Sequence, residues 1–252
     1  MQERTTKDCC YDMCNFALTQ MVSVMRAYIP TKSPDDWKSL LADPGKHWRT
    51  GYSARALAYC WEEASGFPAE VLRLFQSSPI PTLHAIEPLL LLPEYKVPLP
   101  GRGRDSQNDL FMLAKAGDGA LVSIMVEGKV NESFGQPIGV WKGSADGTAN
   151  KAKRLAGLVE CLGLAQLPDT IYYQLVHRAA SAVIAARRFN AAYAIMLVHS
   201  FSPVHAHWDA FADFVALYAK TAERETLIEM AQIGDVRLLI GWATGDSGYL
   251  TR

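Results

Sequence analysis

The chain has almost no excess of either charge, since 25 Lys and Arg stand against 26 Asp and Glu, for a formal net charge of −1. A protein with this balance has no global attraction for a polyanion, so any binding to nucleic acid must rest on a local patch. The sequence also lacks an apolar run near the roughly 20 residues that cross a bilayer. Its five cysteines include no CxxC pair. We therefore expect reduced thiols, a cytoplasmic location and no membrane partner.

Signatures of several enzyme classes are missing as well. The sequence has no GxSxG elbow and no P-loop, and Gly101-Arg102-Gly103 lies in a proline-rich loop without the third glycine of a dinucleotide fingerprint. Segment 205–209 has the H-x-H-x-D spacing of metallo-β-lactamase-like hydrolases, but no histidine follows it. Cys9, Cys10 and Cys14 have no fourth ligand nearby, which makes a poor zinc site.

The length of 252 residues and the 49% hydrophobic content allow a substantial core. We expect one domain over residues 25–252, helical to about residue 78, with its core over about residues 80–252. Residues 1–24 differ in composition and carry Cys9, Cys10 and Cys14, and Met25 offers an internal start. We interpret them as an extension that packs loosely or does not belong to the native product.

Two carboxylates and an amine stand where neighbouring strands would bring them together. Asp109 lies in the apolar segment 106–117, and Glu127 and Lys129 end the apolar segment 120–130. The strand period of two places Glu127 and Lys129 on one face. If the two segments pair through the turn at Asp118-Gly119, Asp109 lies beside them. Carboxylate oxygens suit a hard cation such as Mg²⁺.

Asp109 followed by Glu127-Gly128-Lys129 resembles the signature of the PD-(D/E)XK nuclease superfamily, over roughly residues 80–200. The resemblance implies an α/β (α+β), restriction-endonuclease-like αβββαβ core with a central mixed sheet, here with an added helical N-terminal portion. It implies that Asp109 and Glu127 hold Mg²⁺ or Mn²⁺, and that Lys129 orients the attacking water or stabilises charge on the phosphate. The residue before the acid is Asn108 rather than Pro. The N-terminal third is similar to a family of uncharacterised bacterial proteins with the same core.

A helix is predicted over residues 168–188, with Asp169 or Thr170 as N-cap. Gln174, Arg178 and Ser181 form one polar stripe along it, opposite a stripe of small apolar residues. The resemblance implies that such a helix presents a Gln or a basic residue to the active site. Gln174 and Arg178 are therefore further catalytic candidates and His177 is a weaker one, with a solvated helix face as the alternative.

Other segments complete the expected fold. Strands are predicted over residues 192–199 and 236–243 with a helix over residues 208–224 between them, which indicates one mixed sheet with helices. In the N-terminal portion, a helix is predicted to start at Ser53 as N-cap, and Pro68 opens the next. Prolines between residues 79 and 100 allow only a short helix over residues 83–92. The resemblance makes Glu87 a weak third acidic candidate there.

Two groups of residues are candidates for contact with nucleic acid. Segment 46–52 places aromatic and basic side chains together, although packing of helices on the sheet explains it better. The second group is the best local basic patch, with a solvated loop as its alternative: Lys142, Lys151, Lys153 and Arg154.

Two functions of different classes remain. The first is a metal-dependent phosphodiesterase, a nuclease acting on DNA or RNA. The second is a catalytically inactive nuclease-like fold that binds or regulates, in which Asp109, Glu127 and Lys129 form only a buried salt-bridged cluster. The sequence leaves open whether the protein is an enzyme, which nucleic acid it binds, and whether it forms a homodimer.

Overall fold

The computed structural model describes residues 27–143 and 148–252, so the predicted extension over residues 1–24 lies outside the described residues. Its centre is a six-stranded mixed sheet with the order β1-β2-β3-β4-β6-β5. The strands are β1 (Glu87–Val97), β2 (Ser106–Lys115), β3 (Leu121–Lys129), β4 (Tyr193–Ser200), β5 (Leu227–Ile233) and β6 (Val236–Thr244). The first three form an antiparallel meander, and β4 runs parallel to both β3 and β6. The expected α+β class with a central mixed sheet is confirmed.

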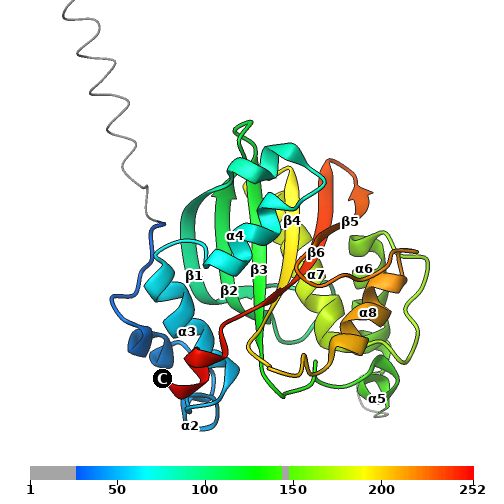
Figure 1. Cartoon of the computed structure of the whole chain (residues 1–252). Helices are drawn as coiled ribbons and strands as arrows, with labels where there is room; N and C mark the ends of the chain where they lie inside the picture. The colour runs from blue at the N-terminus through cyan, green and yellow to red at the C-terminus, as the bar shows by residue number, and fades with distance from the viewer. Residues whose placement is uncertain (1–26, 144–147) are drawn as a thin grey trace, which may run out of the picture.

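Helices cover both faces of this sheet (Figure 1). One face carries α6 (Thr148–Leu162), α7 (Tyr173–Phe189) and α8 (Trp208–Ala216), and α5 (Ile138–Lys142) lies near them. The other face carries α3 (Ser53–Ala64) and α4 (Ala69–Gln76). Shorter elements precede or follow these: η1 (Pro34–Ser39), α2 (Pro44–His47), η2 (Pro81–Ala85) and η3 (Ser247–Thr251). None of the helices in residues 27–143 and 148–252 combines the length and the hydrophobicity that a membrane-spanning helix needs.

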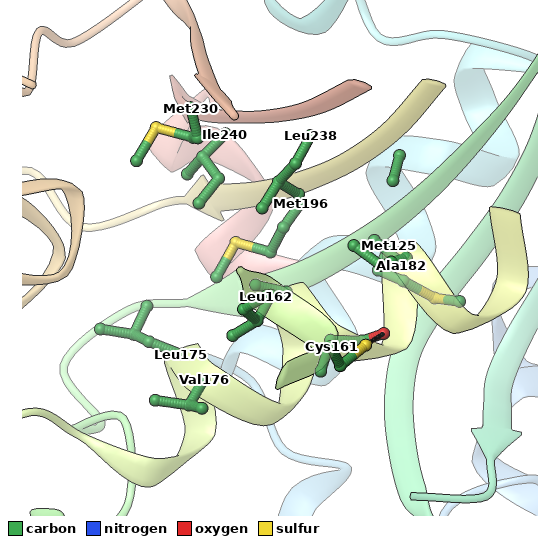
Figure 2. Close-up of a cluster of buried hydrophobic side chains, with 14 of the residues drawn as sticks. Met125, Cys161, Leu162, Leu175, Val176, Ala182, Met196, Met230, Leu238 and Ile240 are labelled. Atoms are coloured by element: carbon green, nitrogen blue, oxygen red, sulfur yellow. Dashed lines mark hydrogen bonds between the residues drawn. The ribbon is translucent and has the colours of Figure 1, made fainter. Parts of the chain in front are cut away.

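The two faces of the sheet each bury an apolar layer. Strand β4 is buried along its whole length, as its uninterrupted apolar sequence predicts for a central strand with helices on both sides. Ala179, Ala182 and Ala186 are fully buried on α7, and their small size lets the helix lie close to β3 and β4. Figure 2 shows the layer between α6, α7 and the sheet, with Met125, Cys161, Leu162, Leu175, Val176, Ala182, Met196, Met230, Leu238 and Ile240.

The short helix that the prolines allowed over residues 83–92 does not form, because residues 87–92 belong to β1. Its prolines argued against a long helix, and the structure shows why they also suit a strand. Strand β1 is at the edge of the sheet, where Pro88 and Pro93 can lack a backbone N–H without breaking an interior ladder. Strand β5, which occupies the opposite edge, was not predicted, and the helix expected to reach residue 224 ends at Ala216.

Helix α7 begins at Tyr173, later than the predicted start with Asp169 or Thr170 as N-cap. The backbone of the preceding residues is engaged elsewhere: Ile138 N–H donates to the Ile171 carbonyl, and Gly139 N–H donates to the Asp169 carbonyl. These bonds hold the segment, which turns at Asp169 and Thr170, against the start of α5. Ser53 is the first residue of α3 rather than its N-cap, whereas Pro68 precedes α4 as expected.

Candidate functional site

Strands β2 and β3 bring the predicted acidic residues together. They pair with Leu110 opposite Val126, and the Asp109 carboxylate accepts a hydrogen bond from the backbone N–H of Gly128 at 2.9 Å. On β3, Lys129 Nζ lies 2.7 Å from Glu127 Oε1, and both side chains are only 3% exposed. Asp109, Glu127 and Lys129 therefore form one cluster at the end of two neighbouring strands.

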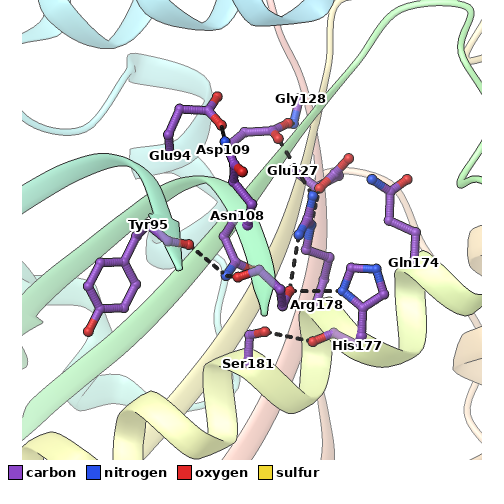
Figure 3. Close-up of polar contacts among 12 residues, drawn as sticks. Glu94, Tyr95, Asn108, Asp109, Glu127, Gly128, Gln174, His177, Arg178 and Ser181 are labelled. Atoms are coloured by element: carbon purple, nitrogen blue, oxygen red, sulfur yellow. Dashed lines mark hydrogen bonds and ion pairs between the residues drawn. The ribbon is translucent and has the colours of Figure 1, made fainter. Parts of the chain in front are cut away.

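Helix α7 adds two more of the predicted residues to this cluster. Lys129 Nζ donates to Gln174 Oε1 at 3.1 Å. The Arg178 guanidinium donates through Nε to Glu127 Oε2, and its Nη2 lies 3.7 Å from Asp109 Oδ1. Figure 3 shows Gln174 and Arg178 pointing from the first turns of α7 toward Glu127. The polar stripe on this helix thus faces the carboxylates rather than solvent.

Glu94 is a third carboxylate at the cluster, and sequence reasoning missed it. It stands between Pro93 and Tyr95, which pair with Leu110 and Asn108, so it lies across from Asp109 (Figure 3). Its φ of 55° is left-handed, an uncommon conformation for a residue other than glycine and one that often marks a functional position. The signal in the sequence was an acid within a mostly apolar segment. It was not recognised because this segment was not predicted to be a strand.

Glu87, the predicted weak third acid, is placed elsewhere. It begins β1 opposite Lys115 at the far end of β2, and its carboxylate pairs with Lys115 Nζ at 2.9 Å. Its side chain is 53% exposed. The structure therefore gives the position beside Asp109 to Glu94 and leaves Glu87 in a surface ion pair.

The cluster holds three carboxylates against two cations. Burial raises the pKa of Glu94 to about 8, with the charge of Asp109 as the next cause. Burial also raises the pKa of Asp109 to about 7, and the charge of Glu127 adds to this. Burial acts in the same direction on Glu127, but Arg178 and Lys129 overcome it and lower its pKa to about 2. Glu94 and Asp109 thus repel each other without full compensation.

The donor atoms of these residues are of the kind that a divalent cation takes, although the oxygens of the three carboxylates do not all lie within 4.8 Å of one another. Their donors are oxygen atoms, which hard ions such as Mg²⁺ and Mn²⁺ prefer. Ionisation of all three carboxylates leaves one negative charge in excess of Lys129 and Arg178, and a bound cation would compensate it. Glu94 and Asp109, which are the acids with raised pKa values, are the two that gain most from such a cation.

The cluster lies in a cleft of about 460 Å³. One wall is the sheet with Gln174 and Arg178 of α7, and a second wall is the loop from Glu132 to Gly135. The N-terminal portion supplies a third wall through Leu41, Ala42, Lys46, His47, Ser53 and Ala54. The aromatic and basic residues of segment 46–52 therefore fall into two sets. Arg49 lies over the Tyr52 ring and Arg55 over the Trp48 ring, whereas the exposed Lys46 and His47 border the cleft.

His177 points away from this cleft toward β2. Its Nδ1 lies 2.8 Å from Ser106 Oγ, which also accepts a hydrogen bond from Arg178 Nη1 at 3.1 Å. Because Arg178 supplies its own hydrogen to Ser106, the hydroxyl hydrogen can be donated to His177. Burial, followed by the charge of Arg178, lowers the pKa of His177 well below its usual value. His177 is therefore a neutral support for Arg178 rather than a member of the cluster.

The predicted basic patch does not form one exposed surface. Lys142 pairs with Asp169 at 2.5 Å, and Lys151 donates to the Trp141 carbonyl. Arg154 is only 7% exposed and donates to the carbonyls of Pro100 and Arg104. Lys153 is exposed on α6. Lys151 and Arg154 instead line a second pocket.

Cys60, Glu70 and His199 form a separate group whose potential ligand atoms lie within 4.8 Å of one another. Trp61 Nε1 donates to His199 Nδ1 at 3.0 Å, which places the hydrogen of a neutral imidazole on Nε2, facing Glu70 Oε1 at 3.0 Å. Both ring nitrogens are thereby engaged. Burial and the charge of Glu70 also raise the pKa of the Cys60 thiol. The group accordingly ties α3 and α4 to β4 and is poorly suited to a metal.

Comparison with known proteins places the chain in a family. We find no match among curated proteins and no match among solved structures. A family model described as a domain of unknown function, DUF6946, matches residues 30–247. This range includes β1, β2, β3 and α7, which carry the whole cluster. The chain therefore belongs to the DUF6946 family.

Proposed function

We propose that this protein is a metal-dependent phosphodiesterase that acts on nucleic acid, with a core of the PD-(D/E)XK type. The observation that carries the proposal is the cluster of Glu94, Asp109 and Glu127 on three adjacent strands, with Lys129 and Arg178 in the same cleft. An excess of buried carboxylates favours a divalent cation, and flanking cations favour an anionic substrate. The order of elements around the cluster supports the proposed core: helices, the three strands β1 to β3, further helices that end with α7, and then β4.

Glu94, Asp109 and Glu127 would hold the ion. Such an ion, when bound, supplies polarisation of the scissile phosphate and lowers the pKa of an attacking water. Glu127 is fixed for this role, since Lys129 and Arg178 each hold one of its oxygens and favour its ionised form. Gly128 N–H orients Asp109 in the same way.

Lys129 and Arg178 would act on the phosphate. Lys129 has three N–H groups, of which Glu127 and Gln174 engage two, so the third can donate to the attacking water or to a phosphate oxygen. Arg178 is held by Glu127 and Ser106 and can stabilise negative charge that develops on the phosphate. Gln174 would orient Lys129. These groups are positioned in advance, which makes electrostatic stabilisation effective.

A catalytically inactive protein that binds or regulates is the alternative. The observation that favours it is that both oxygens of Glu127 are engaged by cations, so the cluster also has the form of a buried salt bridge network. Such a network needs no metal. The two functions differ in whether Glu94 and Asp109 gain a cation, and this difference can be measured.

The test combines metal binding with cleavage. We expect the wild type to bind Mg²⁺ or Mn²⁺ by calorimetry and to cleave members of a panel of single- and double-stranded DNA and RNA. Glu127→Gln keeps the shape but removes charge that the ion needs, so it should weaken metal binding and abolish cleavage. Lys129→Ala keeps the three carboxylates, so it should lower the cleavage rate by roughly 10²–10³-fold while the metal affinity changes much less.

Glu87→Gln is the matched control because it removes an exposed carboxylate from the same strand as Glu94. It should change neither metal binding nor cleavage. Absence of divalent ion binding by the wild type at millimolar concentration, with nucleic acid present, would exclude the enzyme and favour the alternative. Metal binding without cleavage of the panel would leave the ion site intact and contradict the substrate class.

A further inference from the structure

A second pocket of about 340 Å³ lies beside the catalytic cleft, and α7 forms a wall of both. Tyr173 and His177 line the second pocket, whereas Gln174 and Arg178, the next residue in each case, line the cleft. Strand β2 is divided in the same manner, with Ser106 in the second pocket and Gln107 in the cleft. The two cavities therefore share α7 and the start of β2 as walls.

The second pocket is strongly basic. Four cations line it against a single carboxylate, so it carries an excess of three positive charges in a chain whose net charge is −1. The carboxylate is Asp105, and the cations are Arg102, Arg104, Lys151 and Arg154. This concentration of charge is the local patch that an anionic ligand needs in a protein without global attraction for one.

The loop that carries Arg102 and Arg104 is anchored to α6. Arg154 donates to the carbonyls of Pro100 and Arg104 at 3.2 and 2.8 Å. The Asn150 amide accepts from Arg102 N–H at 2.9 Å and donates to the Arg102 carbonyl. The backbone on both sides of the two arginines is thus fixed.

Glycine makes this close approach possible. A Cβ atom on Gly157 of α6 would lie 2.3 Å from Pro100 Cβ, and one on Gly103 would lie 3.1 Å from Arg154 Nη2. Arg102 and Arg104 themselves are exposed, and their side chains make no ion pair with any carboxylate in the described ranges. The backbone of both arginines is fixed by hydrogen bonds, and their side chains are exposed at the edge of the pocket.

The aromatic residues of the pocket are already stacked. Trp141 lies parallel to Tyr173 with ring centroids 4.2 Å apart, and Lys151 Nζ lies over Trp141 at 5.3 Å. Stacking of a nucleobase would have to displace these partners. Burial raises the pKa of Tyr173, and a hydrogen bond from Arg154 together with the charge of Arg154 offsets part of this rise. A guanidinium can only donate, so the hydrogen of the Tyr173 hydroxyl has no acceptor among the described residues. The pocket therefore offers cations and a hydroxyl donor rather than an open ring face.

We propose that this second pocket binds a phosphate group of the nucleic acid strand whose scissile phosphate lies in the catalytic cleft. This inference rests on the proposed function, because the nucleic acid substrate supplies the phosphate. Arg102 and Arg104 would contact phosphate oxygens, and the Tyr173 hydroxyl would donate to one of them. Ser106 contacts His177 of this pocket and Arg178 of the cleft, so the occupied pocket also fixes the strand next to the proposed catalytic arginine.

The experiment measures binding of a fluorescein-labelled DNA oligonucleotide by anisotropy, in EDTA, over a series of salt concentrations. The variants are Arg102→Ala/Arg104→Ala and the control Arg73→Ala/Lys220→Ala, which also removes two exposed cations; Arg73 lies on α4, on the opposite face of the sheet. We expect the first double variant to weaken binding roughly tenfold at low salt and to reduce the salt slope by about 1–2, because two phosphate contacts are lost. The control should change the affinity less than about twofold.

Inorganic phosphate distinguishes the two sources of the ligand. Titration of the wild type with phosphate alone should show weak binding that the first double variant loses. If phosphate binding is lost but oligonucleotide binding is unchanged, the pocket takes a free phosphate compound and the assignment to the substrate strand is overturned. If the two double variants lose the same amount of oligonucleotide affinity, the second pocket is not a phosphate site. Because EDTA removes any divalent ion, failure of the wild type to cleave would refute the proposed function without changing this result.

Discussion

Replacement of Glu94 by glutamine should stabilise the metal-free protein at alkaline pH, although it alters a residue of the proposed active site. Burial and the neighbouring Asp109 raise the pKa of Glu94 to about 8 from an ordinary value of 4.5. A carboxyl with a raised folded-state pKa contributes stability that is complete below the unfolded pKa. That stability is lost as the pH rises through the folded pKa.

The magnitude follows from linkage. The loss is about 1.4 kcal/mol for each pH unit between 4.5 and 8, which sets an upper limit of about 5 kcal/mol at pH 9. Glu94 is partly exposed at an open cleft, where solvent screens part of this cost, so we expect Glu94→Gln to gain about 1–2 kcal/mol. The variant can still accept the hydrogen bond that Gln107 donates to Glu94. In a domain of this size the gain corresponds to a rise in Tm of roughly 2–8 °C.

The assay is thermal unfolding followed from about pH 6 to about pH 9, which brackets the pKa values of Asp109 and Glu94. In EDTA, the Tm advantage of Glu94→Gln should grow as the pH rises. Added Mg²⁺ should then raise the Tm of the wild type more than that of the variant, because the ion binds the native carboxylates. Glu87→Gln, the control on the same strand, should show neither effect. A fall in Tm for Glu94→Gln at alkaline pH would contradict the cost assigned to ionised Glu94, and equal stabilisation of both proteins by Mg²⁺ would contradict its role as a ligand.

Three further predictions concern stability. His177→Gln should reduce acid destabilisation: burial and Arg178 lower the pKa of His177, so its contribution is present above about pH 6.5 and is lost as the pH falls, by at most about 1.4 kcal/mol per pH unit. Equal denaturant midpoints of both proteins at every acidic pH would contradict this. Gly157→Ala should lower Tm, by up to about 8 °C, because displacement of Pro100 costs about 1–3 kcal/mol and Ala gains only about 1 kcal/mol in helix propensity; an increase in Tm would contradict the close packing of α6 on Pro100. Trp61→Phe removes the donor to His199 and should cost about 1–3 kcal/mol in chemical denaturation, so an unchanged midpoint would count against the role of this bond.

The parts of the fold that were predictable carry regular patterns. Strands β3, β4 and β6 are long apolar runs, and the period of two on β3 correctly places Glu127 beside Lys129. The spacing on α7 likewise predicts that Gln174 and Arg178 share a face. Both patterns depend on local geometry, which the sequence contains directly.

Features that depend on contacts between distant segments were not predictable. The edge position of β1 makes its prolines compatible with a strand, and only the sheet order reveals this. Glu94 was missed for the same reason. In the sequence, Arg154 lies among lysines and looks like a surface cation. Because α6 packs against the loop around Pro100, its side chain is buried and donates a hydrogen bond to that loop. The pairing of Trp61 with His199 joins residues far apart in the chain.

Diffraction from crystals soaked in MnCl₂ tests whether the cleft holds a divalent ion, because the anomalous signal of manganese locates the ion without an assumption about the substrate. We expect an anomalous peak in the cleft, in contact with carboxylate oxygens of Asp109 and at least one of Glu94 and Glu127. Crystals of Glu127→Gln treated in the same way should show a weaker peak or none. A fully soaked wild-type crystal without a peak among these carboxylates, or with manganese bound only beside Cys60, Glu70 and His199, would contradict the proposed ion site.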